Sequence, residues 1–215
     1  MRESIILIGA GGHARSCIDV IEQTGRYHIL GLIGFPEQVG LEILGYPIIG
    51  SDDDLGTLMN EEVSFLNALG QIKTPAHRIE IFNRIKQQQG ILPAIISPRA
   101  YVSVHAVVGE GTIIMHGAVV NAGARIGENC IINTNALIEH DVEVDDHCHI
   151  STSSTLNGGV KIRQGTFIGS GSMIRESVMI GENCVIGMGQ NVLKDCGNGY
   201  WLSARESKYE NVDHC

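Results

Sequence analysis

The sequence predicts an α/β N-terminal domain with a small Rossmann-like parallel sheet, followed by a parallel β-helix of hexapeptide repeats. Two observations lead to this prediction. Residues 101–196 divide into sixteen consecutive hexapeptides, and the second residue of each is Val, Ile or Leu. Residues 1–96 instead alternate between short apolar runs and segments with helical spacing. We expect domains at residues 1–96 and 97–196, with a C-terminal tail at residues 197–215.

The N-terminal domain is predicted to be a series of strands and helices. The run "SIILIGA" indicates a buried strand, and apolar positions at helical spacing in "HARSCIDVIEQTG" indicate a helix that Gly25 ends. Strands follow at "HILGLIGF", "YPIIG", "VSFLNALG" and "ILPAIIS", with helices from Ser51 through "DDDLGTLMN" and over "PAHRIEIFNRIKQQQG". Alternating strands and helices imply a small parallel sheet, and Pro98 marks the passage into the repeats.

A glycine-rich turn connects the first strand to the first helix. Residues 9–14, Gly-Ala-Gly-Gly-His-Ala, fit the pattern G-x-G-x-x-A, whose backbone N–H groups can hold a phosphate at the helix N-terminus. A dinucleotide site would also need an acid at the end of the second strand, where residues 33–35 are Ile-Gly-Phe. The turn therefore favours a mononucleotide or a nucleotide-sugar over NAD.

The repeat region is predicted to form a β-solenoid with three faces. Neither an α-helix nor an ordinary strand keeps a strict period of six over 96 residues. Each hexapeptide supplies one short strand with one aliphatic side chain toward the axis, and three hexapeptides complete a coil. Residues 18 apart then stack on one face, about 4.8 Å apart.

The cysteines follow the same repeat. Every sixth position except Gln190 is a small residue, and four of the six cysteines occupy such positions: Cys130, Cys148, Cys184 and Cys196. Because free cysteine is among the most buried residue types, we predict small buried fillers interchangeable with Ala or Ser, without disulfides or thiolate chemistry.

Composition excludes several classes of function. The formal net charge is -9, from 15 basic and 24 acidic residues, which argues against attraction to nucleic acid or anionic lipid. No apolar run approaches the roughly 20 residues of a membrane span. The start "MRESIILIGAGG" does not fit a secretory signal, so we expect a cytoplasmic protein with no nucleic-acid or membrane partner.

One family combines these features. The Gly-His turn, the small α/β domain and the string "INTNALIEHDVEV...HISTSSTLNGGV" resemble the bacillosamine-type nucleotide-sugar N-acetyltransferases and the related sialic-acid O-acetyltransferases, which are hexapeptide-repeat enzymes. This resemblance implies a left-handed β-helix and a homotrimer with its active sites at the subunit interfaces. It also implies acetyl-CoA as co-substrate along the β-helix, and an N-terminal domain that binds the nucleotide part of the acceptor.

The resemblance also assigns roles to individual residues. His140 matches the general base and Asp141 the acid that orients it. The acceptor-binding matches are Gly11, Gly12 and His13 of the turn, with Asn121 and Glu139 on the β-helix. His149 matches a histidine near the acetyl group or CoA. Independently of the resemblance, the oxyanion formed in acetyl transfer needs a donor, and a backbone N–H of Gly158, Gly159 or Gly169 can supply it, so we place Gly158 and Gly169 at the cofactor.

Several alternatives stay open at this point. The sequence departs from the family after the second strand, which lacks acids before Glu37, and at its end, where "NGYWLSARESKYENVDHC" replaces a Gly-x-Pro-Ala-Lys cap. The main reading is N-acetylation of a nucleotide-linked amino sugar for bacterial surface glycan synthesis. The alternatives are an O-acetyltransferase of a sialic-type sugar and a non-catalytic sugar-nucleotide-binding scaffold.

The histidines also raise the question of a metal. His147 and His149 occupy coil positions other than that of His140, so one subunit cannot converge the three on a metal. A zinc site shared across a trimer, as in the carbonic anhydrases built on this solenoid, is the alternative; our prediction is no metal. We expect His105 and His116 to be surface or inter-subunit residues.

Overall fold

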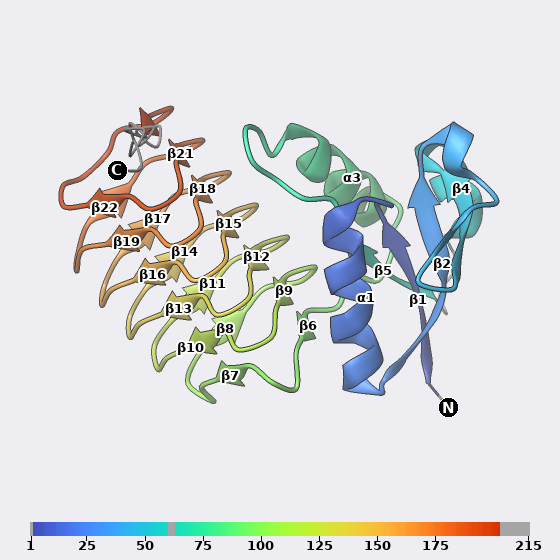
Figure 1. Cartoon of the computed structure of the whole chain (residues 1–215), viewed down its shortest axis with the longest axis horizontal. Helices are drawn as coiled ribbons and strands as arrows, with labels where there is room; N and C mark the ends of the chain where they lie inside the picture. Colours follow the sequence, from blue (N-terminus) through green and yellow to red (C-terminus); the bar gives the residue numbers. More distant parts are fainter. Residues whose placement is uncertain (1, 60–62, 203–215) are drawn as a thin grey trace, which may run out of the picture.

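The computed structural model describes residues 2–59 and 63–202. An N-terminal α/β domain and a stack of parallel coils lie side by side (Figure 1), so the predicted fold class is confirmed. The predicted tail lies outside the described residues from residue 203 onward. No helix in the described ranges is long and apolar enough to cross a membrane.

The N-terminal domain contains one five-stranded sheet in the order β3-β4-β2-β1-β5. All its strand pairs are parallel except β3 with β4. The strands are β1 (Glu3–Ile8), β2 (Tyr27–Gly34), β3 (Glu42–Ile43), β4 (Tyr46–Ser51) and β5 (Val63–Asn67). The helices are α1 (Gly12–Thr24), α2 (Leu55–Leu58) and α3 (Ala76–Gln87), with short 3-10 helices η1 (Pro36–Gln38) and η2 (Asp52–Asp54).

The helices cover the two faces of this sheet. Helix α1 ends at Gly25, whose φ of 63° is the left-handed conformation that glycine adopts without strain. Its buried residues, including Ile18, pack with Leu7 of β1, whereas Phe82 of α3 packs with Ile8 on the opposite face. Strand alternation thus gives each face of the sheet its own apolar core.

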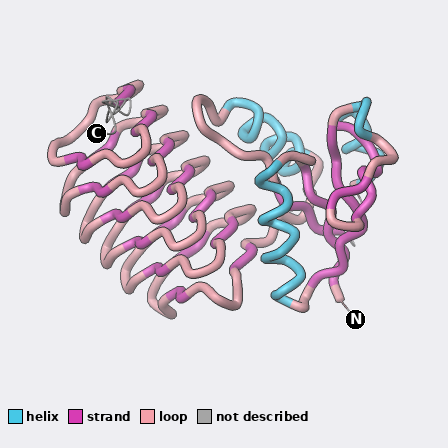
Figure 2. Tube along the Cα trace, viewed as in Figure 1, coloured by secondary structure: helices cyan, strands magenta, loops and turns pink. Residues whose placement is uncertain are grey.

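The hexapeptide repeats form sixteen two-residue strands, one per repeat, in the predicted register. Figure 2 shows them at the sides of a regular coil. They are β7 (Tyr101–Val102), β8 (Val107–Val108), β9 (Ile113–Ile114), β10 (Val119–Val120), β11 (Arg125–Ile126), β12 (Ile131–Ile132), β13 (Leu137–Ile138), β14 (Glu143–Val144), β15 (His149–Ile150), β16 (Thr155–Leu156), β17 (Lys161–Ile162), β18 (Phe167–Ile168), β19 (Met173–Ile174), β20 (Met179–Ile180), β21 (Val185–Ile186) and β22 (Asn191–Val192). Each pairs with strands 18 residues away, as in Val120↔Ile138, so the predicted stacking is confirmed.

The strands make three faces, which we name after their first repeat strands. The β7 face contains β7, β10, β13, β16, β19 and β22. The β8 face contains β8, β11, β14, β17 and β20. The β9 face contains β6 (Ile95–Ile96), β9, β12, β15, β18, β21 and β23 (Trp201–Leu202), and lies nearest the N-terminal domain (Figure 1).

A left-handed residue recurs at the fifth position of the repeats. From residue 111 to residue 189 every fifth position has φ between 52° and 78°. Most of these residues are Gly or Asn, which tolerate this conformation best. Asp141 and His147 also occupy such turns, with φ of 59° and 62°. The repeat therefore explains much of the glycine content that the sequence shows.

The buried cysteines do more than fill space. The Cys148 thiol donates to the carbonyl of Arg163 at 3.1 Å, and the Cys130 thiol donates to the carbonyl of Asp145 at 3.2 Å. Thr166, which follows Cys148 in the same column, donates in the same way to the carbonyl of Gly181. Cys130, Cys148 and Cys184 are buried, as predicted, and Cys196 is half-buried. The thiols also link successive coils, a role that Ser would keep and Ala would not.

Two elements of the N-terminal half differ from the sequence prediction. The segment "ILPAIIS" does not add a full strand to the sheet. Ile91 makes a single bridge to Ser64, and β6 then pairs with β9 in the β-helix. The short strand β3 was not predicted, because two residues in a hairpin carry no period-2 pattern.

The two domains are joined by apolar and polar contacts. Ile95, Ile113 and Ile131 of the β-helix share a buried cluster with α1. His116 was expected at the surface or between subunits. Its Nε2 instead bonds Asp19 Oδ2 of α1 at 2.9 Å, so it links the two domains.

Candidate active site

The predicted base and its partner are adjacent in one turn of the β-helix. His140 and Asp141 follow β13, at the corner between the β7 and β8 faces. His140 Nδ1 lies 2.9 Å from Asp141 Oδ2. Because the carboxylate can only accept, Nδ1 is the donor in this contact, and in the neutral form of the ring Nε2 is the nitrogen with the free lone pair. The side chains are 67% and 73% exposed in the single chain, so Nε2 is open to a reactant.

Glycines make room for this pair in the neighbouring coils. A Cβ added to Gly158 would lie 2.7 Å from both Nε2 and Cε1 of His140. A Cβ added to Gly123, in the preceding coil, would clash with Oδ1 of Asp141. The imidazole and the carboxylate therefore each fill space that only glycine leaves open.

The acceptor-binding candidates on the β-helix lie beside the pair. Asn121 Nδ2 donates to Glu139 Oε2 at 3.0 Å, so these two predicted residues contact each other. Asn157 turns away and donates to the carbonyl of Ile174. The Asn121 contact leaves the other oxygen of Glu139 free to accept from a ligand next to His140.

The three candidate oxyanion donors differ in their hydrogen bonds. The N–H of Gly169 donates to Ile186 O at 2.8 Å, and the N–H of Gly159 donates to His140 O at 3.0 Å. The Gly158 N–H has no backbone acceptor within the described ranges. Gly158 is therefore the candidate whose N–H is free, and it lies directly beside the His140 ring.

His149 lies elsewhere, under the N-terminal domain. It is on the β9 face, and 6% of the residue is exposed. Its Nδ1 donates to the carbonyl of Gln71 at 2.8 Å, and Asn133 lies 3.2 Å from its Nε2. Burial lowers the pKa of His149 to about 3, so the ring is neutral. One chain therefore does not bring His149 to His140.

The glycine turn lines a cavity at the carboxyl ends of β1 and β2. Gly11 is the N-cap of α1, so no capping side chain occupies the N–H groups at the helix start. A Cβ added to Gly11 or Gly12 would meet nothing within 4 Å, so the space in front of them is open. The cavity is about 180 Å³ and is lined by Gly9, Ala10, Gly11, Ile33, Gly34, Phe35, Gln38, Asp52, Leu69 and His77. Free N–H groups at a helix start favour an anion at this place.

Sequence reasoning missed three residues of this cavity. Phe35 is 66% exposed and offers a flat apolar surface. Asp52 pairs with His77 across the opening, Oδ2 to Nε2, at 3.2 Å. An exposed aromatic directly after a glycine-ended strand was the available signal for Phe35. The pairing of Asp52 with His77 had none, because the two lie on different helices.

His13 lies behind the turn. Its ring centroid is 6.3 Å from that of His149, and its Nε2 is buried with no hydrogen-bond partner in the described part of the chain. Burial first, and the Arg78 cation second, lower the pKa of His13 to about 4. The structure thus brings His13 and His149 together.

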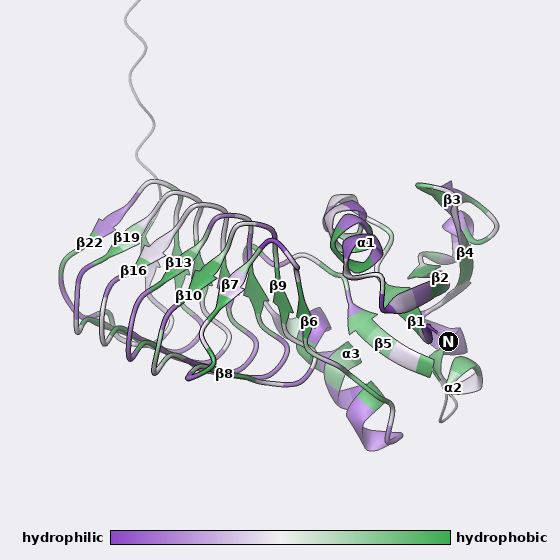
Figure 3. Ribbon diagram, turned by 90° about the horizontal axis from the view of Figure 1, so that it is seen from below, coloured by the Kyte–Doolittle hydropathy of each residue, from purple (hydrophilic) through white to green (hydrophobic). Residues whose placement is uncertain are grey.

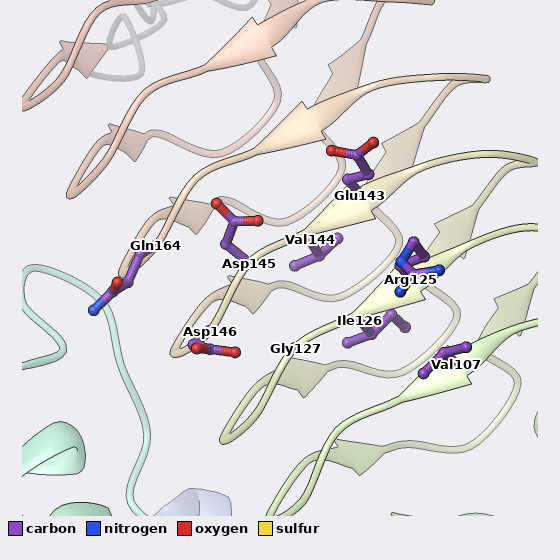
Figure 4. A pocket seen from close by; sticks show the side chains of 9 residues that line it. All are labelled: Val107, Arg125, Ile126, Gly127, Glu143, Val144, Asp145, Asp146 and Gln164. Carbon is purple, nitrogen blue, oxygen red and sulfur yellow. The ribbon is translucent and has the colours of Figure 1, made fainter.

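A larger groove of about 560 Å³ lies on the β8 face (Figure 4) and contains none of the predicted site residues. Two of the carboxylates that line it pair with cations of the next coil. Lys161 Nζ is 3.1 Å from Glu143 Oε1, and Arg163 Nη1 is 3.3 Å from Asp145 Oδ2. Within the described residues no group of three His, Cys, Asp or Glu side chains is arranged to hold a metal ion.

A β-helix that presents an exposed imidazole–carboxylate pair, joined to an α/β domain with an open helix start, is the architecture of a hexapeptide-repeat acyltransferase. Residues 4–85 match the PglD N-terminal domain family, and residues 105–140, 123–158 and 159–189 match the bacterial transferase hexapeptide (six repeats) family. The chain is therefore a hexapeptide-repeat acetyltransferase with a PglD-type N-terminal domain, as the sequence resemblance predicted. No curated protein sequence matches the chain.

Solved structures support this assignment over nearly the whole chain. The acetyltransferase domain of PglB from Neisseria gonorrhoeae FA1090, in complex with acetyl coenzyme A, is 27% identical, with a TM-score of 0.87 over 95% of this chain and 97% of that one. PerB from Caulobacter crescentus, in complex with CoA and GDP-perosamine, is 28% identical, with a TM-score of 0.86 over 94% of both chains. WeeI from Acinetobacter baumannii AYE, at 19% identity and a TM-score of 0.81, shares the fold.

Proposed function

We propose that the protein transfers an acetyl group from acetyl-CoA to the amino group of a nucleotide-linked amino sugar, with His140 as general base. The observation that carries this proposal is the His140–Asp141 hydrogen bond of 2.9 Å, which uses Nδ1 and leaves Nε2 open to a reactant. The similar PglB domain binds acetyl coenzyme A, and PerB binds CoA with GDP-perosamine. As the sequence resemblance implies, we place this reaction in bacterial surface glycan synthesis.

The chemistry required of the turn is modest. The attacking amine must lose a proton, which Nε2 of His140 accepts while Asp141 stabilises the resulting imidazolium. Collapse of the tetrahedral intermediate breaks the thioester C–S bond, and the departing CoA thiolate takes the proton back from His140. The tetrahedral intermediate needs a donor for its oxyanion, and the free N–H of Gly158 lies next to the ring. The free oxygen of Glu139 can hold the amine in place. No metal takes part in this scheme.

The acceptor is proposed to bind in the cavity at the glycine turn. The diphosphate would lie against the N–H groups of Gly11 and Gly12, with His13 behind them. The nucleobase would stack on Phe35, whose exposed ring borders the cavity. The sugar then extends from this cavity toward an active site on the β-helix.

The active site is proposed to lie between subunits of a homotrimer. His140 occupies the corner opposite the β9 face, and His149 lies on that face, so the two can serve one reaction only if neighbouring subunits supply them. The outward-pointing side chains of the β7 face include exposed apolar residues that a neighbouring subunit could cover: Tyr101 is 58% and Met173 50% exposed. Figure 3 shows hydrophobic residues on β10 and β13 of the same face. Burial at such an interface would also exclude water from His140.

The test is an acceptor screen read by mass. The protein is incubated with acetyl-CoA and a panel of 4-amino and 3-amino sugar nucleotides, with free and CMP-linked sialic acids beside them. Mass detection avoids the background that six cysteines would give with a thiol reagent. The variants are His140→Ala and, as a matched control, His105→Ala, which removes an exposed histidine from another turn of the β-helix.

The expected result is one added acetyl group on an amino sugar nucleotide, lost in His140→Ala and kept in His105→Ala. Acetylation of a sialic acid alone would move the assignment to O-acetyl transfer. Absence of transfer to every acceptor, together with absence of acetyl-CoA binding, would favour a sugar-nucleotide-binding scaffold over an enzyme.

A further inference from the structure

Arg78 of α3 is a buried cation at the interface of the two domains. Only 2% of the residue is exposed, and none of the ion pairs in the described part of the chain includes it. Burying a charge without a counter-ion is costly unless hydrogen bonds satisfy it. Such an arrangement calls for a reason beyond packing.

One side of the guanidinium reaches His149 through Gln71. Arg78 Nη1 donates to Gln71 Oε1 at 3.0 Å, and Gln71 Nε2 donates to the carbonyl of Gly165 at 3.1 Å. The main-chain carbonyl of Gln71 accepts from His149 Nδ1 at 2.8 Å. Arg78 therefore fixes the loop whose carbonyl sets the tautomer of His149.

The other side of the guanidinium holds the β-helix directly. Arg78 Nη2 donates to the carbonyl of Asn129 at 2.9 Å and to Asn129 Oδ1 at 3.1 Å. Asn67 and Asn129 each donate to the carbonyl of Arg78, at 2.9 and 3.3 Å. The same residue thus connects β5, α3 and the second coil, and no other cation with this degree of burial occurs in the described ranges.

Two complementary groups remain in this interface. Arg78 Nε and His13 Nε2 are both buried and have no partner in the described part of the chain. Nε always carries a proton, and Nε2 of a neutral imidazole can accept one. Because neither atom has a partner, the two do not bond each other directly, and one bridging water would satisfy both groups.

We propose that Arg78 is a positioning residue that ties the acceptor-binding turn to His149, by donating to Gln71 on one side and, through one bridging water, to Nε2 of His13 on the other. This inference rests on the proposed function. The link would fix the distance between the nucleotide subsite on α1 and the β9 face, which we expect to meet His140 of a neighbouring subunit. It also keeps Nε2 of His149 as an acceptor, so His149 cannot donate to an oxyanion there.

The charges around His149 support a neutral pair of imidazoles. His149 faces His13 of α1 and Arg78 of α3, with Asn133 and Phe167 on its own face. After burial, the Arg78 cation contributes to the low pKa of both histidines. Both rings therefore stay neutral at physiological pH, which the proposed hydrogen bonds require.

The test begins with the unmodified protein. Long-range ¹H–¹⁵N spectra of histidine-labelled protein report which ring nitrogen is protonated. We expect His149 and His13 as Nδ1–H tautomers that resist protonation down to about pH 5. Protonation of either ring on Nε2 would overturn the proposal, whether or not any variant folds.

Two variants then test the link. Arg78→Lys keeps the positive charge but loses the planar guanidinium that donates to several partners, and Arg78→Met removes both the charge and the donors. We expect each to mix the tautomers of His149 and to lower kcat about 10-fold or more, since small misplacements in active sites have such effects. Arg78→Met should also raise the pKa of His13. The matched control is Lys86→Met, which removes an exposed α3 cation that contacts Glu110 across the same interface.

The outcomes separate this inference from the proposed function. Unchanged tautomers and unchanged kcat in both Arg78 variants would refute the positioning role while leaving the acetyl transfer intact. Altered tautomers in a protein that acetylates no acceptor would support the link and count against the proposed function.

Discussion

Replacing Gly158 with alanine is expected to displace the His140 ring. The new Cβ would lie 2.7 Å from Nε2 and Cε1, whereas non-bonded carbon contacts lie at about 3.5 Å or more, so the ring must move by roughly 0.8 Å. A misplacement of about 1 Å at a reacting group can lower the rate about 100-fold. We therefore expect kcat/KM to fall roughly 30- to 100-fold, and the hydrogen bond to Asp141 to be lost or lengthened.

The stability of this variant is expected to change differently from its activity. Gly158 does not have a positive φ, so alanine fits its backbone, and glycine-to-alanine changes at such sites stabilise by about 0.4–1 kcal/mol through the unfolded chain. Strain against the ring will cancel part of this gain. In the His140→Ala background the ring is absent, and thermal unfolding should show the gain in full.

The assay is steady-state acetyl transfer on the acceptor found by the screen, with thermal unfolding of the two single variants and the double variant. Gly197→Ala is the matched control, because a Cβ there meets nothing within 4 Å and its φ is not positive. If Gly158→Ala keeps the kcat/KM of the unmodified protein, the ring of His140 does not act from its place above Gly158, and the reasoning fails.

Further predictions follow from the same geometry. Asp141→Asn should keep the melting temperature, because Asn tolerates the left-handed turn, and should lower kcat about 10-fold through loss of the charge-assisted hydrogen bond to His140. Asp141→Ala should lower kcat as well and also lose about 1 kcal/mol of stability. Cys148→Thr should have a free energy of unfolding in urea about 1 kcal/mol higher than that of Cys148→Ala, because the hydroxyl keeps a hydrogen-bond donor. Phe35→Ala should weaken nucleotide binding in calorimetry about 10-fold, by loss of stacking, without lowering stability. The folded-state pKa values of His13 and His149, about 4 and 3, lie below the ordinary 6.5, so the unfolded chain binds more protons between these values. The contribution of these two histidines to stability should therefore be constant above about pH 6.5, and urea unfolding should show a loss of about 3 kcal/mol from His13 and about 5 kcal/mol from His149 as the pH falls to 4 and 3.

The sequence predicted the β-helix in detail because its period is a direct property of the chain. A strict repeat of six places residues 121, 139 and 157 in one column, and the hydrogen bond between Asn121 and Glu139 shows that the first two touch. Likewise the closeness of Gly158 to His140 follows from a separation of 18. In a solenoid, sequence distance converts into spatial distance without knowledge of the rest of the fold.

The interface between the domains could not be predicted in this way. Arg78 lies in "PAHRIEIFNRIKQQQG", where a charged residue on an amphipathic helix normally faces solvent. Its burial depends on how α3 packs on the second coil, which no local pattern encodes. His149 was assigned near the acetyl group from its neighbours in sequence, but its contact with Gln71 depends on a loop 78 residues away. The segment "ILPAIIS" was misassigned for the same reason, since an apolar run can pair equally well with the N-terminal sheet or with the β-helix.

The left-handed fifth position has a consequence for how such sites can arise. From residue 111 to residue 189 every repeat already has a left-handed residue there, so a carboxylate at residue 141 demands no new backbone geometry, and one histidine before it completes the pair. The reactive unit is thus contained in a single repeat with a glycine in the next coil. Exchanging hexapeptides 18 residues apart would move this histidine–carboxylate pair along the β-helix axis in steps of one coil. Chains of this architecture could in that way accommodate acceptors of different length on an unchanged frame.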